Sequence, residues 1–220
     1  MKVSDHGNLM SFESPQGQEA VFGGNEGYVV CSGGGGTIHG HDTGPLEAGF
    51  GPPTFSQPNG AGTFPLTVTR NTTDGKLQLK QVWNKPDAAE KDVTVTMTLK
   101  NLSSSSIPTA TIARTGDFDV GTLSNDQGAA TADSAWQWDD RFAADSPPVG
   151  LMLTALTLGI SRDPHIETRS AWNDTRDGCL ANEVLTPTTS AQDLTMRVFS
   201  IVGNLSAGQS KSVKFEYGRM

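Results

Sequence analysis

Apolar and polar side chains alternate with a period of two along several stretches of this sequence. The clearest is 91–101, where Val93, Val95, Met97 and Leu99 occupy every second position, and threonines and a lysine lie between them. Such alternation places the two kinds of side chain on opposite faces of an extended chain. Residues 91–101 are therefore predicted to form a half-buried β-strand of roughly 36 Å, which implies a large sheet.

A polar turn follows this strand, at the serines 103–106. The β-like pattern then resumes behind Pro108, at Ile107, Ala110, Ile112 and Ala113. Because proline has no N–H to donate to a ladder, the second strand is expected to begin at an edge or a bulge. We expect the two strands to pair with each other as a hairpin.

The remaining pattern predicts further strands and two irregular regions. Strands are expected at 9–12 with a return strand at 19–22, and at 28–31, 64–69, 76–84, 149–160, 194–204 and 210–217. At the very apolar 149–160 a helix is the alternative. The Gly- and Pro-rich region 40–62 is expected to be a long loop that packs on the body through Leu46, Phe50 and Phe55, and 162–185 is also expected to be irregular. The predicted fold is all-β: one antiparallel β-sandwich domain over 1–220, or a larger supersandwich, with long loops and little helix.

Composition and charge narrow the class of partner. The chain has 25 Gly and 12 Pro in 220 residues, which is typical of strands joined by turns. Its net charge of −8 disfavours nucleic acid and anionic membranes as partners. No apolar run approaches the roughly 20 residues of a membrane span, so no membrane insertion is expected.

The two cysteines bear on the compartment. Cys31 and Cys179 could pair across the fold or remain as two buried thiols. Few lysines and many Thr, Ser and Gly resemble the composition of an exported bacterial domain, although residues 1–4 lack the apolar core of a signal peptide. We expect a secreted or cell-surface protein whose leader is absent from this sequence; a cytoplasmic protein is the alternative.

Two segments resemble those of a known group of proteins. VGNLSAGQSKSVKFEYG at 202–218 and KDVTVTMTLKNLSSSSIP at 91–108 resemble strand-turn-strand hairpins of β-sandwich modules in secreted bacterial proteins, including supersandwich domains of the sugar-mutarotase type. The resemblance implies architecture only and transfers no catalytic residue.

Two carboxylates form the first candidate site. Asp117 and Asp119 lie two apart in GDFDVG, so in an extended segment both project to one side. Such a pair repels unless a cation or a proton lies between the carboxylates. Three interpretations stay open: solvated loop acids, a Ca²⁺ site with oxygen ligands, and a general acid with a raised pKa.

Two tryptophans form the second candidate site. Trp136 and Trp138 flank one residue and would share a face of a strand, followed by Asp139, Asp140 and Arg141. Indoles edged by charged groups suit a sugar, because its ring faces are apolar and its hydroxyls need hydrogen-bond partners. The alternative is that the two indoles belong to the core.

Two histidines form the third. His39 and His41 precede Asp42 and could offer two imidazoles to a zinc ion, with a third ligand from His6, His165 or Glu167. The alternative is a pair of mobile surface histidines.

Two functions follow from these candidates. The first is a non-catalytic extracellular or surface module that binds carbohydrate or another small molecule, or assembles with other subunits, including copies of itself, through Trp136, Trp138 and the neighbouring charges. The second is an enzyme that acts on a small cyclic or sugar-like substrate, with acid-base groups drawn from Asp117, Asp119, His39 and His41.

Overall fold

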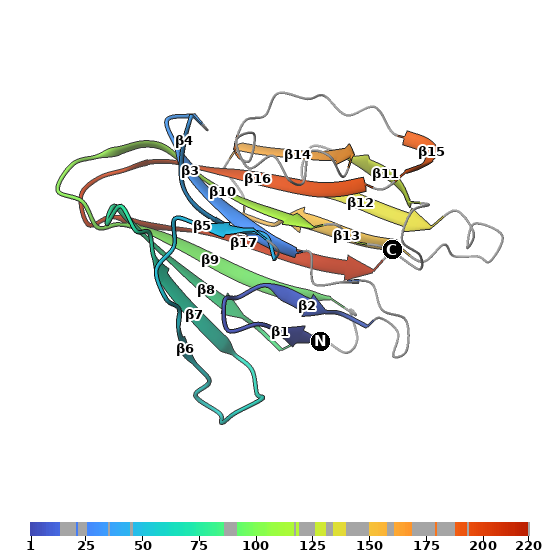
Figure 1. Cartoon of the computed structure of the whole chain (residues 1–220), viewed down its shortest axis with the longest axis horizontal. Helices are drawn as coiled ribbons and strands as arrows, with labels where there is room; N and C mark the ends of the chain where they lie inside the picture. The colour runs from blue at the N-terminus through green and yellow to red at the C-terminus, as the bar shows by residue number, and fades with distance from the viewer. Residues whose placement is uncertain are drawn as a thin grey trace.

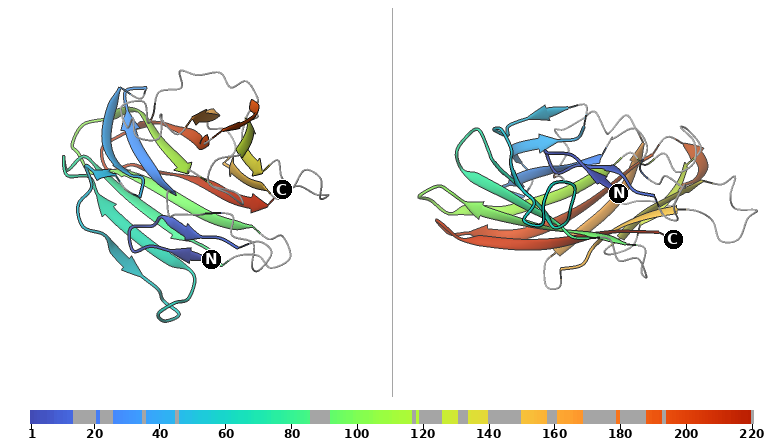
Figure 2. Two further views of the ribbon diagram at one scale, coloured as in Figure 1. Left: turned by 45° about the vertical axis from the view of Figure 1, so that its right-hand side comes forward. Right: turned by 90° about the horizontal axis from the view of Figure 1, so that it is seen from below.

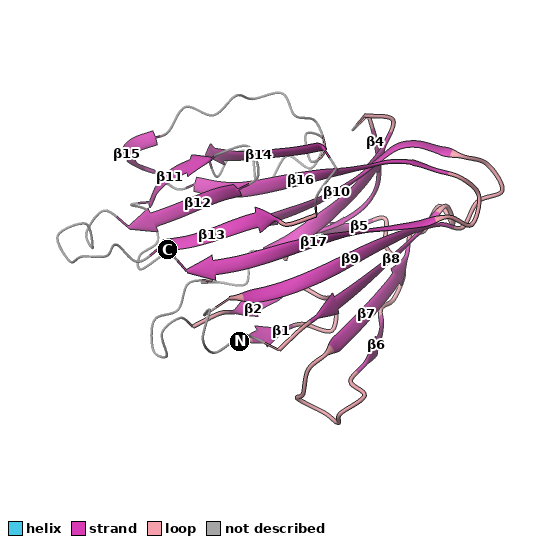
Figure 3. Ribbon diagram, turned by 180° about the vertical axis from the view of Figure 1, so that it is seen from behind, coloured by secondary structure: helices cyan, strands magenta, loops and turns pink. Residues whose placement is uncertain are grey.

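The computed structural model describes residues 1–13, 21, 26–34, 36–44, 46–85, 92–116, 118, 126–130, 134–139, 150–157, 161–168, 179, 188–192 and 194–219. These residues form 17 strands in sheets of two, six and nine strands, and every strand pair is antiparallel. The coloured part of Figure 3 contains strands and loops but no helix. No helix able to cross a bilayer is therefore present among the described residues.

Two large sheets make the body of the molecule (Figure 1). The six-stranded sheet has the order β14 (Ser161–Thr168), β16 (Leu194–Leu205), β10 (Ile107–Gly116), β3 (Glu26–Ser32), β4 (Thr37–Asp42), β5 (Glu47–Ala48). The nine-stranded sheet has the order β15 (Thr188–Gln192), β11 (Asp126–Ala130), β12 (Ser134–Asp139), β13 (Gly150–Ala155), β17 (Ser210–Arg219), β9 (Val93–Asn101), β8 (Leu77–Trp83), β7 (Leu66–Asn71), β6 (Thr54–Ser56). The N-terminal strands β1 (Lys2–Val3) and β2 (Leu9–Ser11) pair with each other in a sheet of two strands.

Side chains from the facing surfaces of the two sheets form one core. On β9 the apolar positions are buried and the threonines between them are half-buried, as the period-two pattern predicts. Inward-facing residues of the other sheet, such as Val30, Ile112 and Val198, belong to the same apolar cluster. The predicted antiparallel β-sandwich is confirmed, and Figure 2 shows its twisted sheets from two further sides.

The predicted hairpin around the serine turn is wrong in its pairing. β9 lies in the nine-stranded sheet, where it pairs with β8 and β17, whereas β10 lies in the six-stranded sheet, where it pairs with β3 and β16. The final two strands behave in the same way, because β16 pairs with β10 and β17 pairs with β9. Both connections therefore cross from one sheet to the other, side by side.

The side chain of Asn101 joins these two crossings. Its Nδ2 donates to the carbonyls of Ser105 and Leu205, at 2.7 and 2.9 Å, and its Oδ1 accepts from the Ser103 N–H at 2.8 Å. Asn101 is fully buried. Hydrogen bonds of this kind satisfy carbonyls that a hairpin ladder would otherwise have bonded.

Several other expectations need correction. The region 40–62 contains β5, β6 and the end of β4, and only Phe50 of its three large apolar side chains is buried; Leu46 and Phe55 are exposed. The region 162–185 includes most of β14, whose strand character was missed because Pro164 and charged residues interrupt the alternation. β2 pairs with β1. The return strand expected at 19–22 lies outside the described residues except for Val21, so it stays a prediction.

Cys31 and Cys179 form a disulfide, with their Cα atoms 6.1 Å apart. Cys31 lies on β3, on the face of the six-stranded sheet that points away from the main core, together with a second apolar cluster of Val29, Ala113 and Phe199. The disulfide therefore holds residue 179 against this outer face.

Candidate functional site

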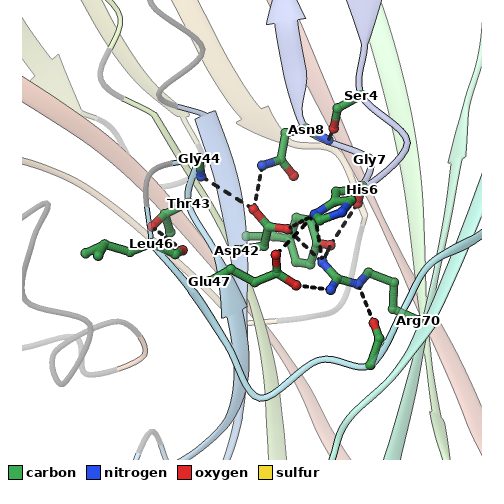
Figure 4. Close-up of polar contacts among 12 residues, drawn as sticks. Ser4, His6, Gly7, Asn8, Asp42, Thr43, Gly44, Leu46, Glu47 and Arg70 are labelled. Atoms are coloured by element: carbon green, nitrogen blue, oxygen red, sulfur yellow. Dashed lines mark hydrogen bonds and ion pairs between the residues drawn. The ribbon is translucent and has the colours of Figure 1, made fainter.

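The N-terminal turn brings a histidine to the edge of the six-stranded sheet (Figure 4). The turn between β1 and β2 is closed by a hydrogen bond of 3.0 Å from the Gly7 N–H to the Ser4 carbonyl, and Gly7 has a φ of +88°. Glycine adopts this left-handed conformation at little cost. The turn directs His6 toward Asp42, the last residue of β4, so that His6 Nδ1 lies 2.8 Å from Asp42 Oδ2.

Arg70 completes this cluster from an inward-facing position on β7. Its Nη1 donates to Asp42 Oδ2 at 2.7 Å, its Nη2 donates to Glu47, and its Nε donates to the Gly51 carbonyl at 3.1 Å. The Arg70 and Asp42 side chains are only 2% and 3% exposed. A buried charge is tolerated only when it is paired and hydrogen-bonded, and this pair meets both conditions.

His6 and Glu47 are the accessible members of the cluster, with side chains 34% and 35% exposed. His6 Nδ1 faces Asp42 and Glu47, at 2.8 and 3.3 Å. Carboxylates only accept hydrogen bonds, so Nδ1 is the donor, and in a neutral ring Nε2 is left with its lone pair. The His6 side chain is 34% exposed, and Nε2 has no hydrogen-bond partner among the described residues. The arrangement can hold or transfer a proton at Nε2.

The same cluster fits a metal ion poorly. One ligand atom from each of His6, Asp42 and Glu47 lies within 4.8 Å of the others. However, the Arg70 guanidinium already binds both carboxylates, so a cation would have to displace it from a buried site. We therefore assign the positive charge at this position to Arg70.

A second charged cluster lies in the core between the sheets. Arg114 on β10 donates to the Glu26 carboxylate on β3, and Tyr217 on β17 donates to the same oxygen. All three side chains are fully buried. Burial raises the pKa of Glu26, although Arg114 opposes this; burial also raises the pKa of Tyr217. Burial alone would lower the pKa of Arg114, but the charge of Glu26 raises it, so the guanidinium stays protonated.

Tyr28 and the N-terminal turn connect the two clusters. Tyr28 Oη donates to the His6 carbonyl at 2.8 Å and accepts from Arg70 Nη1 at 3.3 Å. On the other side of the turn, Trp83 Nε1 donates to the Gly7 carbonyl at 3.2 Å. The position of His6 therefore depends on residues from both sheets.

His39 and His41 do not act as a pair. A register shift in the pairing of β3 with β4 falls beside His39. Both ring nitrogens of His39 are bonded, Nε2 to Ser32 Oγ at 2.8 Å and Nδ1 to Asp74 Oδ2 at 2.7 Å. The backbone of His41 pairs with that of Val29 on β3. The His41 Nδ1 is buried and has no hydrogen-bond partner in the described part of the chain.

The two tryptophans lie on the outer face of the nine-stranded sheet. Along β12, Ala135 and Gln137 are buried, whereas the alternate residues Trp136 and Trp138 are half-buried. The two indoles therefore lie on the face opposite to Ala135 and Gln137. Trp138 Nε1 donates to Gln127 Oε1 of β11 at 3.0 Å. The backbone of Asp139 ends β12, while Asp117, Asp119, Asp140 and Arg141 lie outside the described residues.

The sequence reasoning missed most members of both charged clusters. One signal was available: Arg70, Gln81 and Arg114 interrupt strands at positions whose period-two phase points inward. A charged or amide side chain at such a position requires a buried partner. No comparable signal marked the partners Glu26, Asp42 and Glu47. They lie on other strands, and which strands come together is not visible in the local pattern.

Comparisons with known proteins add a fold likeness. No protein-family model matches the sequence, and no curated protein matches it. Among solved structures, a bacterial glucoamylase complexed with acarbose is similar with a TM-score of 0.58 at 8% identity, over 92% of this chain and 27% of that chain. A structure assigned as a kojibiose phosphorylase from the human microbiome has a TM-score of 0.46 at 7% identity, over 92% of this chain and 22% of that chain. This chain thus spans about a quarter of the length of each, and the likeness to the glucoamylase is one of fold alone.

Proposed function

We propose that this β-sandwich module binds carbohydrate through Trp136 and Trp138. The observation that carries the proposal is that both indoles are half-buried on one outer face of β12. An indole fixed in this way offers a rigid apolar surface for a sugar ring. Because Gln127 already accepts the hydrogen bond of the Trp138 N–H, that ring is held in place before a ligand arrives.

The neighbouring strands leave room beside the two rings. Across β13, Trp136 pairs with Met152 and Trp138 pairs with Gly150, so the second indole has no side chain opposite it on that strand. On the other side lie Ala129 and Gln127 of β11. Gly150 is small, Met152 has a flexible thioether and Gln127 has an amide. Such neighbours suit a ligand that presents both apolar ring faces and hydroxyls.

Two further observations support a carbohydrate partner outside the cytoplasm. The glucoamylase that shares this fold was solved with acarbose, which is consistent with a sugar ligand but assigns no glucoamylase activity to this chain. The disulfide between Cys31 and Cys179 is typical of proteins from oxidising compartments, in keeping with a secreted or cell-surface location.

Retention on immobilised glycans tests the proposal. Trp136→Ala and Trp138→Ala are each expected to weaken retention about 10-fold or more, because buried aromatic anchors dominate such interfaces. Thr96→Ala and Lys80→Ala are matched controls, since both residues lie on the same outer face but on β9 and β8. Unchanged retention in the tryptophan variants, or no retention of the parent on any glycan, would contradict the proposal.

A second candidate function is acid-base chemistry on a small cyclic or sugar-like substrate. The accessible Nε2 of His6, backed by Asp42 through Nδ1, favours it. Proton NMR of monosaccharides incubated with the protein would reveal conversion, and His6→Gln is expected to abolish it. Asp119→Asn, assayed in parallel, tests the carboxylate that the sequence singled out as a candidate acid. Absence of conversion by the parent would remove this candidate.

A further inference from the structure

Three residues from separate elements form a hydrogen-bonded chain at the end of the β3–β4 hairpin. Ser32 ends β3, His39 lies on β4, and Asp74 lies in the turn between β7 and β8. Ser32 Oγ lies 2.8 Å from His39 Nε2, and His39 Nδ1 lies 2.7 Å from Asp74 Oδ2. The order hydroxyl, imidazole, carboxylate is that of a nucleophile, its general base and the group that orients the base.

The donors and acceptors fix the direction of both hydrogen bonds. An ionised carboxylate only accepts, so His39 Nδ1 carries the proton toward Asp74. In the neutral imidazole Nε2 is then an acceptor, and the Ser32 hydroxyl must be its donor. The Ser32 proton therefore already points at the nitrogen that would take it.

Asp74 is itself held in place by its own turn. Its Oδ1 accepts from Thr72 Oγ1 at 2.6 Å and from the Lys76 N–H at 3.0 Å, which leaves Oδ2 directed at His39. Partial burial raises the pKa of Asp74, but these hydrogen bonds and the one from His39 outweigh it, so the pKa is lowered. The carboxylate is therefore ionised at neutral pH.

The surroundings of Ser32 restrict what could reach it. Ser32 and His39 are 7% and 5% exposed, so a bulky group cannot approach. Gly33 and Gly34, which follow Ser32, are exposed, and a Cβ added to either would meet nothing within 4 Å. A small acyl group could enter from the side of these two glycines.

We propose that Ser32 is a nucleophile and that this site hydrolyses small carboxylic esters, a function separate from glycan binding. Ser32 Oγ forms a bond to the ester carbonyl carbon while its proton passes to His39 Nε2. The carbon–oxygen bond of the alcohol breaks, and Nε2 returns the proton to that alcohol. Water then attacks the acyl-serine, gives its proton to Nε2 and releases the acid, and Ser32 recovers its proton.

A candidate backbone donor for the developing oxyanion follows the nucleophile by two residues in the chain. The Gly33 N–H is occupied, because it donates to the Pro108 carbonyl at 2.9 Å. The Gly34 N–H has no acceptor among the described residues, and Gly34 is in the left-handed conformation with a φ of +70°. One such donor can stabilise a tetrahedral intermediate substantially.

Two measurements test the proposal. The first is hydrolysis of p-nitrophenyl acetate, in which Ser32→Ala is expected to lower kcat/KM by about 10³-fold or more. Adding His39→Gln to Ser32→Ala is expected to cause no further loss, because members of a triad act as one unit. Asp74 is a positioning residue, so the variant Asp74→Asn is expected to have a lower kcat and an unchanged KM.

The second measurement uses the parent protein, so it does not depend on whether the variants fold. The parent protein is labelled with a small methyl fluorophosphonate, matched in size to the acyl group that the site would admit, and mass spectrometry locates the adduct, which is expected on Ser32 and on no other serine. Ser212→Ala, on the exposed side of β17, is the matched control and should hydrolyse the ester at the parental rate. An adduct elsewhere, no adduct at all, or a Ser32→Ala variant with parental hydrolysis would overturn the proposal, whatever the result of the glycan experiments.

Discussion

Arg114 donates to the carboxylate of Glu26 at a point in the core where neither side chain has any exposed surface. Both residues belong to the six-stranded sheet, and two further partners of Arg114 belong to the opposite one: Arg114 Nε donates to Tyr217 Oη at 2.8 Å, and Nη1 donates to Gln81 Oε1 at 2.7 Å. The guanidinium also lies 5.0 Å from the ring centre of Trp83. The pair therefore links the two sheets through directional bonds inside an otherwise apolar core.

Removing one member of this pair should be far more harmful than removing both. Arg114→Leu is expected to lower the free energy of unfolding by about 3–5 kcal/mol, because it leaves Glu26 buried without its counter-ion. The double variant Arg114→Met, Glu26→Gln is expected to lose clearly less. Urea unfolding measures both, with the exposed Lys100→Met as a control. A double variant as unstable as the single one would contradict this account.

The turn that presents His6 depends on Gly7 for two separable reasons. Its positive φ strains any other residue, and a Cβ there would collide with the amide of Gln81, which is fixed by Arg114. Gly7→Ala is expected to cost more than the roughly 1 kcal/mol of backbone strain alone. Gly60→Ala is the matched control, because Gly60 has a φ of +103° but open space around it. Equal losses of unfolding free energy in the two variants would rule out the collision.

The contact between His39 and Asp74 should make stability sensitive to acid. The pKa of Asp74 is lower in the folded protein than in the unfolded chain, so its contribution is complete above the unfolded pKa and is lost as the pH falls through the folded one, below about pH 4. Because Asp74 is about a third exposed, the contribution is expected to stay below about 1 kcal/mol. The difference in unfolding free energy between the parent and Asp74→Asn, measured from pH 7 to pH 2, should shrink; a constant difference would contradict the linkage.

The disulfide should contribute strongly to stability, because it joins residues 148 apart in sequence. Replacing both cysteines, as Cys31→Ser with Cys179→Ser, is expected to cost about 2–5 kcal/mol in unfolding free energy. Reduction of the parent should cause the same loss and should leave the double variant unaffected. A parent whose thermal midpoint does not move on reduction would be inconsistent with this bond.

The strands with a regular alternation were predictable, because which side chains point inward is a local property of an extended chain; strands without it, such as β4 and β14, were missed. The alternation along 91–101 identified the buried face of β9 residue by residue. The partner of β9 was not predictable, since a polar turn is compatible both with a hairpin and with a crossing to the other sheet. The crossing depends on contacts such as those of Asn101, whose acceptor Leu205 is 104 positions away.

The sequence by itself determined the class of fold and the buried face of the strands that alternate regularly, because burial of apolar side chains follows a period that short segments carry. Only the tertiary structure decided which polar groups meet. Ser32, His39 and Asp74 come from three elements, and His6 reaches Asp42 across 36 positions. Hydrogen bonds require atoms within about 3 Å, and that proximity is set by how whole sheets pair and stack rather than by any local pattern.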